Sequence, residues 1–414
     1  VDSCIMQFDN STSTYRTYDN FFQHQWQVAR RSVPKKIPAK YSFLKEQFSM
    51  APSLVINSSS ECNMKCLYCP TGGENLYNIR YDEQVSETYI KNLVRAFKSH
   101  MMQDRENAVL RITGGEPLLS ERERKRVADI LEVAIDYNKI VLCTNGVYLK
   151  KAYEDNKSQW DRVKNVLLLK ISLDTLDEQR FKQITGTGEN TSDLFRNVCD
   201  NIIFAKKNGF KIELNMVATS INLQTAEDIV KVFDFARQNE LVGLKVLTVN
   251  DFGERVQFGQ SEDEKEHISS ILNNTIEIMK IRNYEERHVY LNDNKGIQMR
   301  RFVARSQNDK ECTLTIVDHN SDIGTITPRR TFSEFCKTCE FYPESESVKG
   351  KRKKPCATGM MSLTLRADGI LSPCRLCPEK GSSIDKLTKT KIQKVVDDSL
   401  KAFDKCFHKT ISGV

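Results

Sequence analysis

Short β-type runs alternate with amphipathic helical stretches from Leu54 onward, and this alternation constrains the fold more than any other feature of the sequence. Apolar residues fall at every fourth position in Val85–Phe97, which is the pattern of a helix with one buried face. The β-type runs recur at intervals of roughly 30 residues, the length of a strand–helix–strand unit. The predicted strands are Leu54–Asn57, Val109–Thr113, Ile140–Cys143, Val166–Ser172, Lys211–Ala218 and Leu244–Val249.

Strands that alternate with helices are typically parallel and joined by right-handed crossovers. We therefore predict an α/β protein whose core, residues 53–250, is a partial (β/α)6 TIM-like barrel. In such a barrel the chemistry takes place at the C-terminal ends of the strands. After this core come a helical stretch, Glu262–Ile281, and then sequence rich in cysteine and loops. We expect an N-terminal extension over 1–52, a connecting helical and strand region over 251–330, and a smaller C-terminal Cys-rich α+β domain over 331–414.

Composition narrows the class of protein further. With 414 residues and 39% hydrophobic content, the chain can bury one large core and a smaller one. Its longest apolar runs end far short of the ~20 residues that span a bilayer, and residues 1–20 lack the apolar centre of a signal peptide. We expect a cytoplasmic protein without a membrane partner. The net charge of +7 favours an anionic substrate or cofactor, but it is too small and too evenly spread to indicate nucleic acid.

Thirteen cysteines gather mainly in two places, which favours metal ligation over disulfides. The first group, Cys62, Cys66 and Cys69, forms a C-x3-C-x2-C run directly after the first predicted strand. Three thiolates on one tight loop can bind three irons of a [4Fe–4S] cube and leave the fourth iron open to a small molecule. A zinc site is the alternative, although zinc knuckles prefer four ligands in two C-x2-C pairs.

This cysteine spacing, with Tyr68 before the last cysteine, resembles the radical S-adenosylmethionine (radical SAM) superfamily. Gly114, Gly115, Glu116 and Pro117 follow the second strand and match the GGEP motif of that family. Thr144 and Ser172 follow the third and fourth strands, where relatives contact the bound cofactor. The resemblance implies that Cys62, Cys66 and Cys69 hold a [4Fe–4S] cluster, and that S-adenosyl-L-methionine is bound by Tyr68, Gly114, Gly115, Glu116, Pro117, Thr144 and Ser172.

The resemblance also implies a mechanism and partners. The methionine end of S-adenosylmethionine chelates the open iron, and an external electron donor of the flavodoxin or ferredoxin type supplies an electron. Cleavage gives a 5′-deoxyadenosyl radical, which abstracts hydrogen from a small-molecule substrate. The protein positions the reactants and excludes solvent, as for other chemistry carried by a cofactor. The sequence singles out no acid–base catalyst, so the catalytic residues stay unassigned.

The second group of cysteines surrounds Met361–Ser372, which alternates like a hairpin around Ala367–Gly369. This arrangement resembles the SPASM and twitch domains, which carry auxiliary clusters. It implies an auxiliary [4Fe–4S] cluster on Cys336, Cys339, Cys356 and Cys374, with Cys377 and Cys406 as further candidates. A zinc site stays open as an alternative, since two C-x2-C pairs suit tetrahedral sulfur coordination.

The fullest likeness within the superfamily is to the GTP 3′,8-cyclases, through Leu169–Asp177 and Ile184–Gly186. Ser362 and Thr364, however, stand where that group carries arginines, and Glu213 stands where it carries a lysine. An anion beside a triphosphate would repel it. We therefore expect a different small metabolite as substrate, such as a sugar, nucleoside or amino-acid unit. The alternatives are the GTP 3′,8-cyclase reaction, a peptide-modifying maturase, and a non-catalytic or zinc-stabilised binding protein.

Overall fold

The computed structural model describes residues 53–69, 86–101, 109–187, 192–249, 261–290, 298–306, 308–318, 362–367, 369–372 and 382–383. The predicted N-terminal extension and the cysteines proposed for the auxiliary cluster, Cys336, Cys339, Cys356, Cys374, Cys377 and Cys406, lie outside these ranges. The group Cys62, Cys66 and Cys69 lies inside them.

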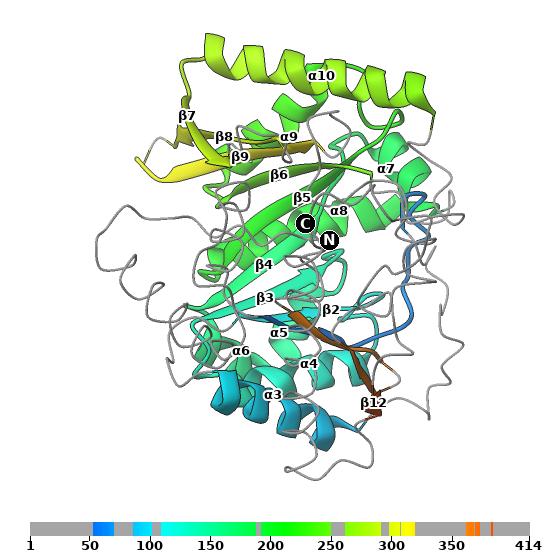
Figure 1. Ribbon diagram of the computed structural model, residues 1–414, viewed down its shortest axis with the longest axis vertical. Helices are drawn as coiled ribbons and strands as arrows, with labels where there is room; N and C mark the ends of the chain where they lie inside the picture. The colour runs from blue at the N-terminus through cyan, green and yellow to red at the C-terminus, as the bar shows by residue number, and fades with distance from the viewer. Residues whose placement is uncertain are drawn as a thin grey trace, which may run out of the picture.

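One sheet of twelve strands runs through the described part of the chain, in the order β12-β11-β10-β1-β2-β3-β4-β5-β6-β9-β8-β7 (Figure 1). Its strands are β1 Ser53–Asn57, β2 Val109–Thr113, β3 Lys139–Thr144, β4 Leu167–Ser172, β5 Lys211–Ala218, β6 Gly243–Thr248, β7 Glu285–Tyr290, β8 Gln298–Arg305, β9 Glu311–Asp318, β10 Ser362–Leu365, β11 Ile370–Ser372 and β12 Ser382–Ser383. The helices are α3 Glu87–Met101, α4 Glu121–Val133, α5 Leu149–Asp155, α6 Lys157–Val163, α7 Glu178–Thr185, α8 Ser192–Lys207, α9 Ala226–Gln238 and α10 Glu262–Ile281.

The six predicted strands are confirmed as β1 to β6, and all five neighbouring pairs among them are parallel. The sheet is open, since β12 and β7 are the outer strands of its described order. This is the α/β fold of a partial TIM-like barrel, as the alternation of strands and helices predicts. The predicted helix Glu262–Ile281 is α10, with the same bounds, and Ser261 caps it through a hydrogen bond from the Glu264 amide.

Segments after residue 250 extend the same sheet at both edges. β9 pairs in parallel with β6, and β8 and β7 follow in antiparallel order. The predicted hairpin is confirmed as the antiparallel pair β10 and β11, and β10 lies parallel to β1. No helix among the described residues is long and apolar enough to span a membrane.

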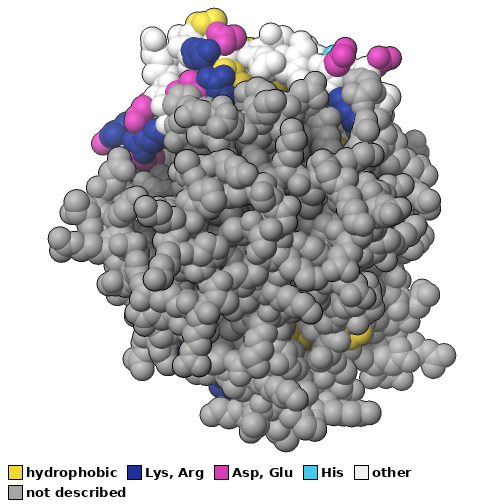
Figure 2. Space-filling model, viewed as in Figure 1, with side chains coloured by type: hydrophobic (Ala, Val, Ile, Leu, Met, Phe, Trp, Pro, Cys, Tyr) yellow, Lys and Arg dark blue, Asp and Glu magenta, His cyan; other side chains and the backbone are white. Residues whose placement is uncertain are grey.

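The hydrophobic core lies between the sheet and its helices. Leu54 and Ile56 of β1 and Leu110 and Ile112 of β2 are fully buried, and they join one apolar cluster with side chains of the helices. Because side chains alternate along a strand, the residues between them face the other side of the sheet. Around α10, by contrast, acidic and basic side chains are interspersed on the surface (Figure 2).

Candidate active site

The loop that carries Cys62, Cys66 and Cys69 begins at the C-terminal end of β1 and is held by the end of α7. The Lys65 amide donates to the carbonyl of Thr185 at 2.8 Å, and the Leu67 amide donates to that of Ile184 at 3.0 Å. Gly186 then turns the chain with φ +60°, and a Cβ there would lie 2.9 Å from the Lys65 carbonyl oxygen. This close approach explains why glycine ends α7.

The Gly114–Gly115 turn lies against the chain just before Cys62. The Gly115 amide donates to the Ser59 carbonyl at 2.8 Å, and the Glu116 amide donates to the Glu61 carbonyl at 2.7 Å. A Cβ on Gly114 would lie 2.4 Å from the Ser59 oxygen, and one on Gly115 would lie 2.1 Å from the Glu61 oxygen. Only glycine lets the two backbones come this close.

The Glu116 side chain joins the end of β2 to the end of β3. It is 1% exposed, and it accepts hydrogen bonds from the Thr144 hydroxyl at 2.6 Å, the Asn145 amide at 2.7 Å and the Leu118 amide at 2.9 Å. Burial raises the pKa of this carboxyl to about 7, although the three donors favour its ionised form. The Thr144 hydroxyl also accepts from the Gly146 amide, so it is engaged within the protein.

Asn145 connects the end of β3 to the cysteine loop. Its side-chain amide donates to the Asn63 side-chain oxygen at 2.7 Å and approaches the Cys62 sulfur at 3.8 Å. The Met64 amide also donates to the Cys62 sulfur, at 3.4 Å. Donors aimed at the sulfur suit a thiolate that serves as a metal ligand. Burial acts the other way and is the main reason that the pKa of the Cys62 thiol is raised to about 11.

Tyr68 is tied to the fourth strand end. Its hydroxyl donates to the Asp174 carboxylate at 2.6 Å, and the other carboxylate oxygen accepts from the Val217 amide at 2.7 Å. The Asn222 side chain donates to the Asp174 carbonyl at 2.8 Å. Burial raises the pKa of the Asp174 carboxyl to about 6. These contacts bring β4 and β5 to the cysteine loop.

Burial raises the pKa of the Cys66 thiol, and Cys69 and Cys62 lie close enough to raise it further. All three thiols are partly buried. Across the described ranges, no three His, Cys, Asp or Glu side chains converge as the ligands of one metal ion. A [4Fe–4S] cube takes one thiolate per iron, so its ligands surround it and need not meet at one point. The donor set and the hydrogen bonds to sulfur therefore fit a cube with one open iron.

Residues 56–236 match the radical SAM superfamily. The superfamily segment thus runs from β1 into α9 and contains the cysteine loop and the strand ends around it.

Two curated relatives of this chain carry the same enzyme name. The probable GTP 3′,8-cyclase of Archaeoglobus fulgidus is 33% identical over 147 residues, which cover 35% of this chain and 44% of that protein. The GTP 3′,8-cyclase of Lactiplantibacillus plantarum is 27% identical over 292 residues, which cover 69% of this chain and 73% of that protein. The first match thus spans less than half of the relative's length.

Among solved structures, Streptococcus suis SuiB bound to the precursor peptide SuiA has the same fold. The TM-score is 0.51 with 15% sequence identity, and the match covers 95% of this chain and 82% of SuiB. At this identity the likeness concerns the fold.

The structure brings together the site residues predicted after the first three strands, from the cysteine loop through the Gly114–Glu116 turn to Thr144, and it adds two residues and one backbone segment that sequence reasoning missed. Asn145 and Asp174 stood inside predicted motifs, but only their neighbours Thr144 and Ser172 were selected. The third addition, Ile184–Thr185, accepts hydrogen bonds from the loop through its backbone carbonyls. Their partners lie far away in the sequence, as in the bond between Tyr68 and Asp174, so no local pattern could assign them.

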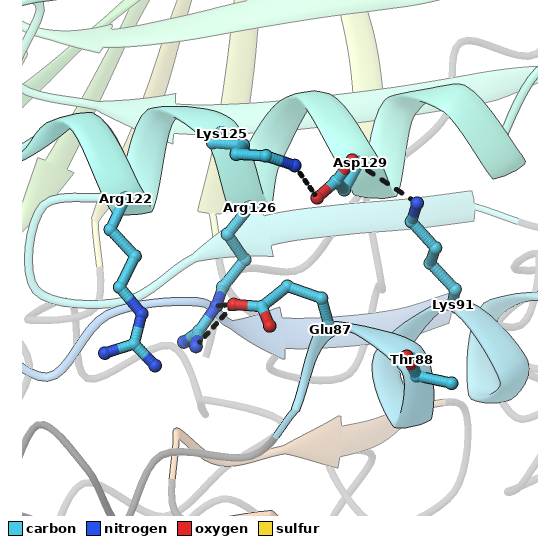
Figure 3. A pocket seen from close by; sticks show the side chains of 7 residues that line it. All are labelled: Glu87, Thr88, Lys91, Arg122, Lys125, Arg126 and Asp129. Atoms are coloured by element: carbon cyan, nitrogen blue, oxygen red, sulfur yellow. Dashed lines mark hydrogen bonds and ion pairs between the residues drawn. The ribbon is translucent and has the colours of Figure 1, made fainter.

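The segment before the cysteine loop is also fixed from the helix side, by Arg126 of α4. This side chain is 1% exposed, and it donates to the Ser58 carbonyl at 3.0 Å and pairs with Glu87 of α3 at 3.1 Å. The pair lines a surface cavity of about 400 Å³ between α3 and α4 (Figure 3). Lys91 and Lys125 both reach Asp129 in the same cavity, so it holds a network of mixed charge.

The sheet face opposite the helices carries charged side chains. Lys170 of β4 pairs with Glu213 of β5 at 2.7 Å, and both are largely buried. Burial disfavours the Glu213 carboxylate, but Lys170 and Lys245 outweigh that effect and lower its pKa. The sequence suggested that Glu213 would repel an anion in this region. The structure pairs it with a lysine instead, which cancels much of that repulsion.

Proposed function

We propose that this chain is a radical SAM enzyme that holds a [4Fe–4S] cluster on Cys62, Cys66 and Cys69 and acts on a small metabolite. When bound, the cluster and S-adenosylmethionine supply a 5′-deoxyadenosyl radical, which removes hydrogen from the substrate. The observation that carries this proposal is the geometry of the cysteine loop. Three thiols stand on one loop, and the GGEP turn, the ends of three neighbouring strands and the end of α7 hold it.

The residues around the loop position it. Glu116 fixes the ends of β2 and β3 to each other, and the Gly114–Gly115 backbone packs directly against Ser59 and Glu61 just before Cys62. Asp174 holds the Tyr68 hydroxyl, so we propose that Tyr68 contacts S-adenosylmethionine through its backbone or ring. Ser172 ends β4 beside this position and stays a proposed contact.

We also propose an auxiliary [4Fe–4S] cluster on Cys336, Cys339, Cys356 and Cys374, and an external electron donor of the flavodoxin or ferredoxin type. The C-terminal cysteine spacing supports the auxiliary cluster. The hairpin β10–β11 supports it too, because it brings the chain just before Cys374 onto the edge of the sheet beside β1.

The test is anaerobic reconstitution with iron and sulfide, followed by reduction in the presence of S-adenosylmethionine. We expect about eight irons per chain for two cubes and release of 5′-deoxyadenosine. Replacing Cys62, Cys66 and Cys69 together by alanine should remove about four irons and abolish the release. Cys199→Ala is the matched control, since this partly buried cysteine lies on α8, and it should change neither quantity. Undiminished 5′-deoxyadenosine from the triple variant would refute the proposal.

The GTP 3′,8-cyclase reaction is a second candidate, favoured by the names of the relatives and by the pairing of Glu213 with Lys170. Incubation of the reduced enzyme with GTP and S-adenosylmethionine distinguishes the two candidates. Conversion of GTP to a cyclised nucleotide selects the cyclase. Recovery of intact GTP alongside 5′-deoxyadenosine selects a different metabolite.

A further inference from the structure

Asn63, the residue after Cys62 on the cysteine loop, carries a buried hydrogen-bond donor. Its side-chain nitrogen Nδ2 is buried and has no hydrogen-bond partner in the part of the chain that the structure describes. A buried donor without an acceptor is uncommon in native proteins, because it has lost its hydrogen bonds to water and gained none in return. The Asn63 nitrogen therefore indicates an acceptor that the described residues do not supply.

A backbone donor fixes which atom of this side chain lacks a partner. The Val147 amide donates to the Asn145 side-chain oxygen at 3.1 Å, and a backbone N–H can only donate. The Asn145 side-chain nitrogen therefore points the other way, where it donates to the Asn63 side-chain oxygen at 2.7 Å. Exchanging the two Asn63 atoms would set two donors against each other. The atom without a partner is thus the nitrogen of Asn63.

This nitrogen lies beside the sulfur that we propose as an iron ligand. The Cys62 sulfur is 4.0 Å from the Asn63 side-chain oxygen, which shares one carbon atom with Nδ2. The Met64 amide and the Asn145 side chain already approach the same sulfur. Several N–H groups thus gather around Cys62. Hydrogen bonds to sulfur are one of the means by which a protein sets the reduction potential of an iron–sulfur cluster.

We infer that the Asn63 amide donates a hydrogen bond to a sulfur of the cluster beside Cys62, and that Asn145 orients this amide, so that together they raise the reduction potential of the cluster. This inference rests on the proposed function and deepens it. Reduction transfers one electron from the external donor to the cluster, adds one negative charge, and neither forms nor breaks a bond. A donor aimed at sulfur favours the more negative state and so makes reduction easier.

The test is a potentiometric titration of the full, reconstituted chain, followed by electron paramagnetic resonance without S-adenosylmethionine. The signal of the Cys62 cluster is the one that changes when S-adenosylmethionine is then added. Asn63→Leu removes the donor and should shift the equilibrium about tenfold toward the oxidised cluster, which is about 59 mV for one electron. Asn63→Asp keeps an oxygen for Asn145 but replaces the donor by an anion, so it should shift the midpoint further in the same direction. An unchanged midpoint in both variants would overturn the inference.

Asn201→Leu is the matched control. The Asn201 side chain on α8 donates to the carbonyls of Gly146 and Val147 at 2.9 and 2.7 Å, so its loss loosens the turn that carries Asn145 and leaves Asn63 intact. We expect an unchanged midpoint. A shift equal to that of Asn63→Leu would mean that any loosening of this turn changes the potential, and it would overturn the inference.

Asn145→Leu tests the positioning role. It releases the Asn63 side chain and should shift the midpoint in the same direction as Asn63→Leu. No shift would overturn the role given to Asn145. Asn63→Leu should also slow 5′-deoxyadenosine release while leaving the KM for S-adenosylmethionine unchanged. A raised KM with an unchanged midpoint would mean that S-adenosylmethionine accepts the Asn63 hydrogen bond, which would overturn the inference.

Iron content keeps the inference distinct from the proposed function. If the variant with alanine at Cys62, Cys66 and Cys69 binds as much iron as the wild-type chain, the proposed function fails and the inference fails with it. If the wild-type chain binds about four irons more than that variant, and Asn63→Leu and Asn63→Asp retain the wild-type iron content and midpoint, only the inference fails.

Discussion

One face of the sheet carries apolar side chains and the other carries polar and charged side chains, although the same strands supply both faces. On β6, Leu244 and Val246 are buried against the helices, while Lys245 between them is buried on the other face. Burial alone therefore does not distinguish residues that hold the fold from residues suited to bind a ligand. What distinguishes the two kinds of residue is the face of the sheet on which the side chain lies, and this face follows from the alternation of side chains along the strand.

The difference between the faces is also energetic. Burying aliphatic side chains on the helix face stabilises the fold by roughly 25 cal/mol for each Å² of apolar surface. Burying charge on the other face opposes folding unless the charge is paired. On that face Lys170 pairs with Glu213, and Lys245 helps to lower the pKa of the same carboxyl, so the buried charges balance one another.

The largest expected effect is on the free energy of unfolding, and it should differ between two neighbouring residues of β6. Leu244→Ala should lower the free energy of unfolding by about 3 to 4 kcal/mol, because it leaves a cavity in the core. Lys245→Gln should lower it by about 1 kcal/mol or less, because Glu213 keeps Lys170 as its partner. Urea denaturation measures both values. Equal losses would erase the proposed division between the two faces.

The next effect concerns the ion pair between Lys170 and Glu213. Lys170→Met leaves a buried carboxylate without its closest cation and should cost about 2 kcal/mol of unfolding free energy. Adding Glu213→Gln to this variant should restore part of the loss, because the buried carboxylate is then gone. A double-mutant cycle measures the coupling, and strictly additive losses would contradict the pairing.

The same pair predicts a dependence on pH. The pKa of Glu213 is lowered in the folded protein, so its contribution to stability is present above the unfolded value of about 4.3 and is lost as the pH falls through the folded value. Glu213→Gln should therefore be relatively less harmful at low pH than at pH 7. Melting temperatures of the wild-type chain and the Glu213→Gln variant between pH 7 and pH 3 measure whether the two stabilities converge as the pH falls. Curves that stay parallel would count against this prediction.

A smaller effect compares two buried tyrosines. Tyr68→Phe removes the hydrogen bond to Asp174 at the cysteine loop, and Tyr137→Phe removes a 2.7 Å bond to the Val94 carbonyl in the helix-side core. Each should cost about 1 kcal/mol of unfolding free energy. Only Tyr68→Phe should also raise the KM for S-adenosylmethionine in the 5′-deoxyadenosine assay. Equal effects of the two substitutions on this KM would mean that the hydrogen bond between Tyr68 and Asp174 does not position the loop.

The smallest expected effect lies on the surface, in the cavity between α3 and α4. Lys125 is 71% exposed and pairs with Asp129 at 2.9 Å. Lys125→Gln should change the unfolding free energy by about 0.5 kcal/mol or less, because water and salt screen exposed pairs. Thermal melting in low and high salt measures it, and a loss comparable to that of Leu244→Ala would contradict the low weight given to this network.

The sequence by itself determined the parts of this protein that local pattern encodes. The period of apolar residues gave β1 to β6 and the bounds of α10, because each element buries one face and its neighbours along the chain are enough to reveal it. The motifs at Cys62–Cys69 and Gly114–Pro117 followed the strands directly, so the edge of the sheet that carries the candidate site was readable as well.

Tertiary structure alone decided which distant residues meet. It set β9 beside β6 and β10 beside β1, gave Glu213 a lysine partner and tied Tyr68 to Asp174, 106 residues away. Strand partners and charge partners depend on which surfaces pack together after the chain has folded, and no window of neighbouring residues contains that information. The row of polar side chains on the sheet face opposite the helices is a product of that packing, since its members come from five different strands: Ser172, Asn215, Lys245, Thr315 and Arg301.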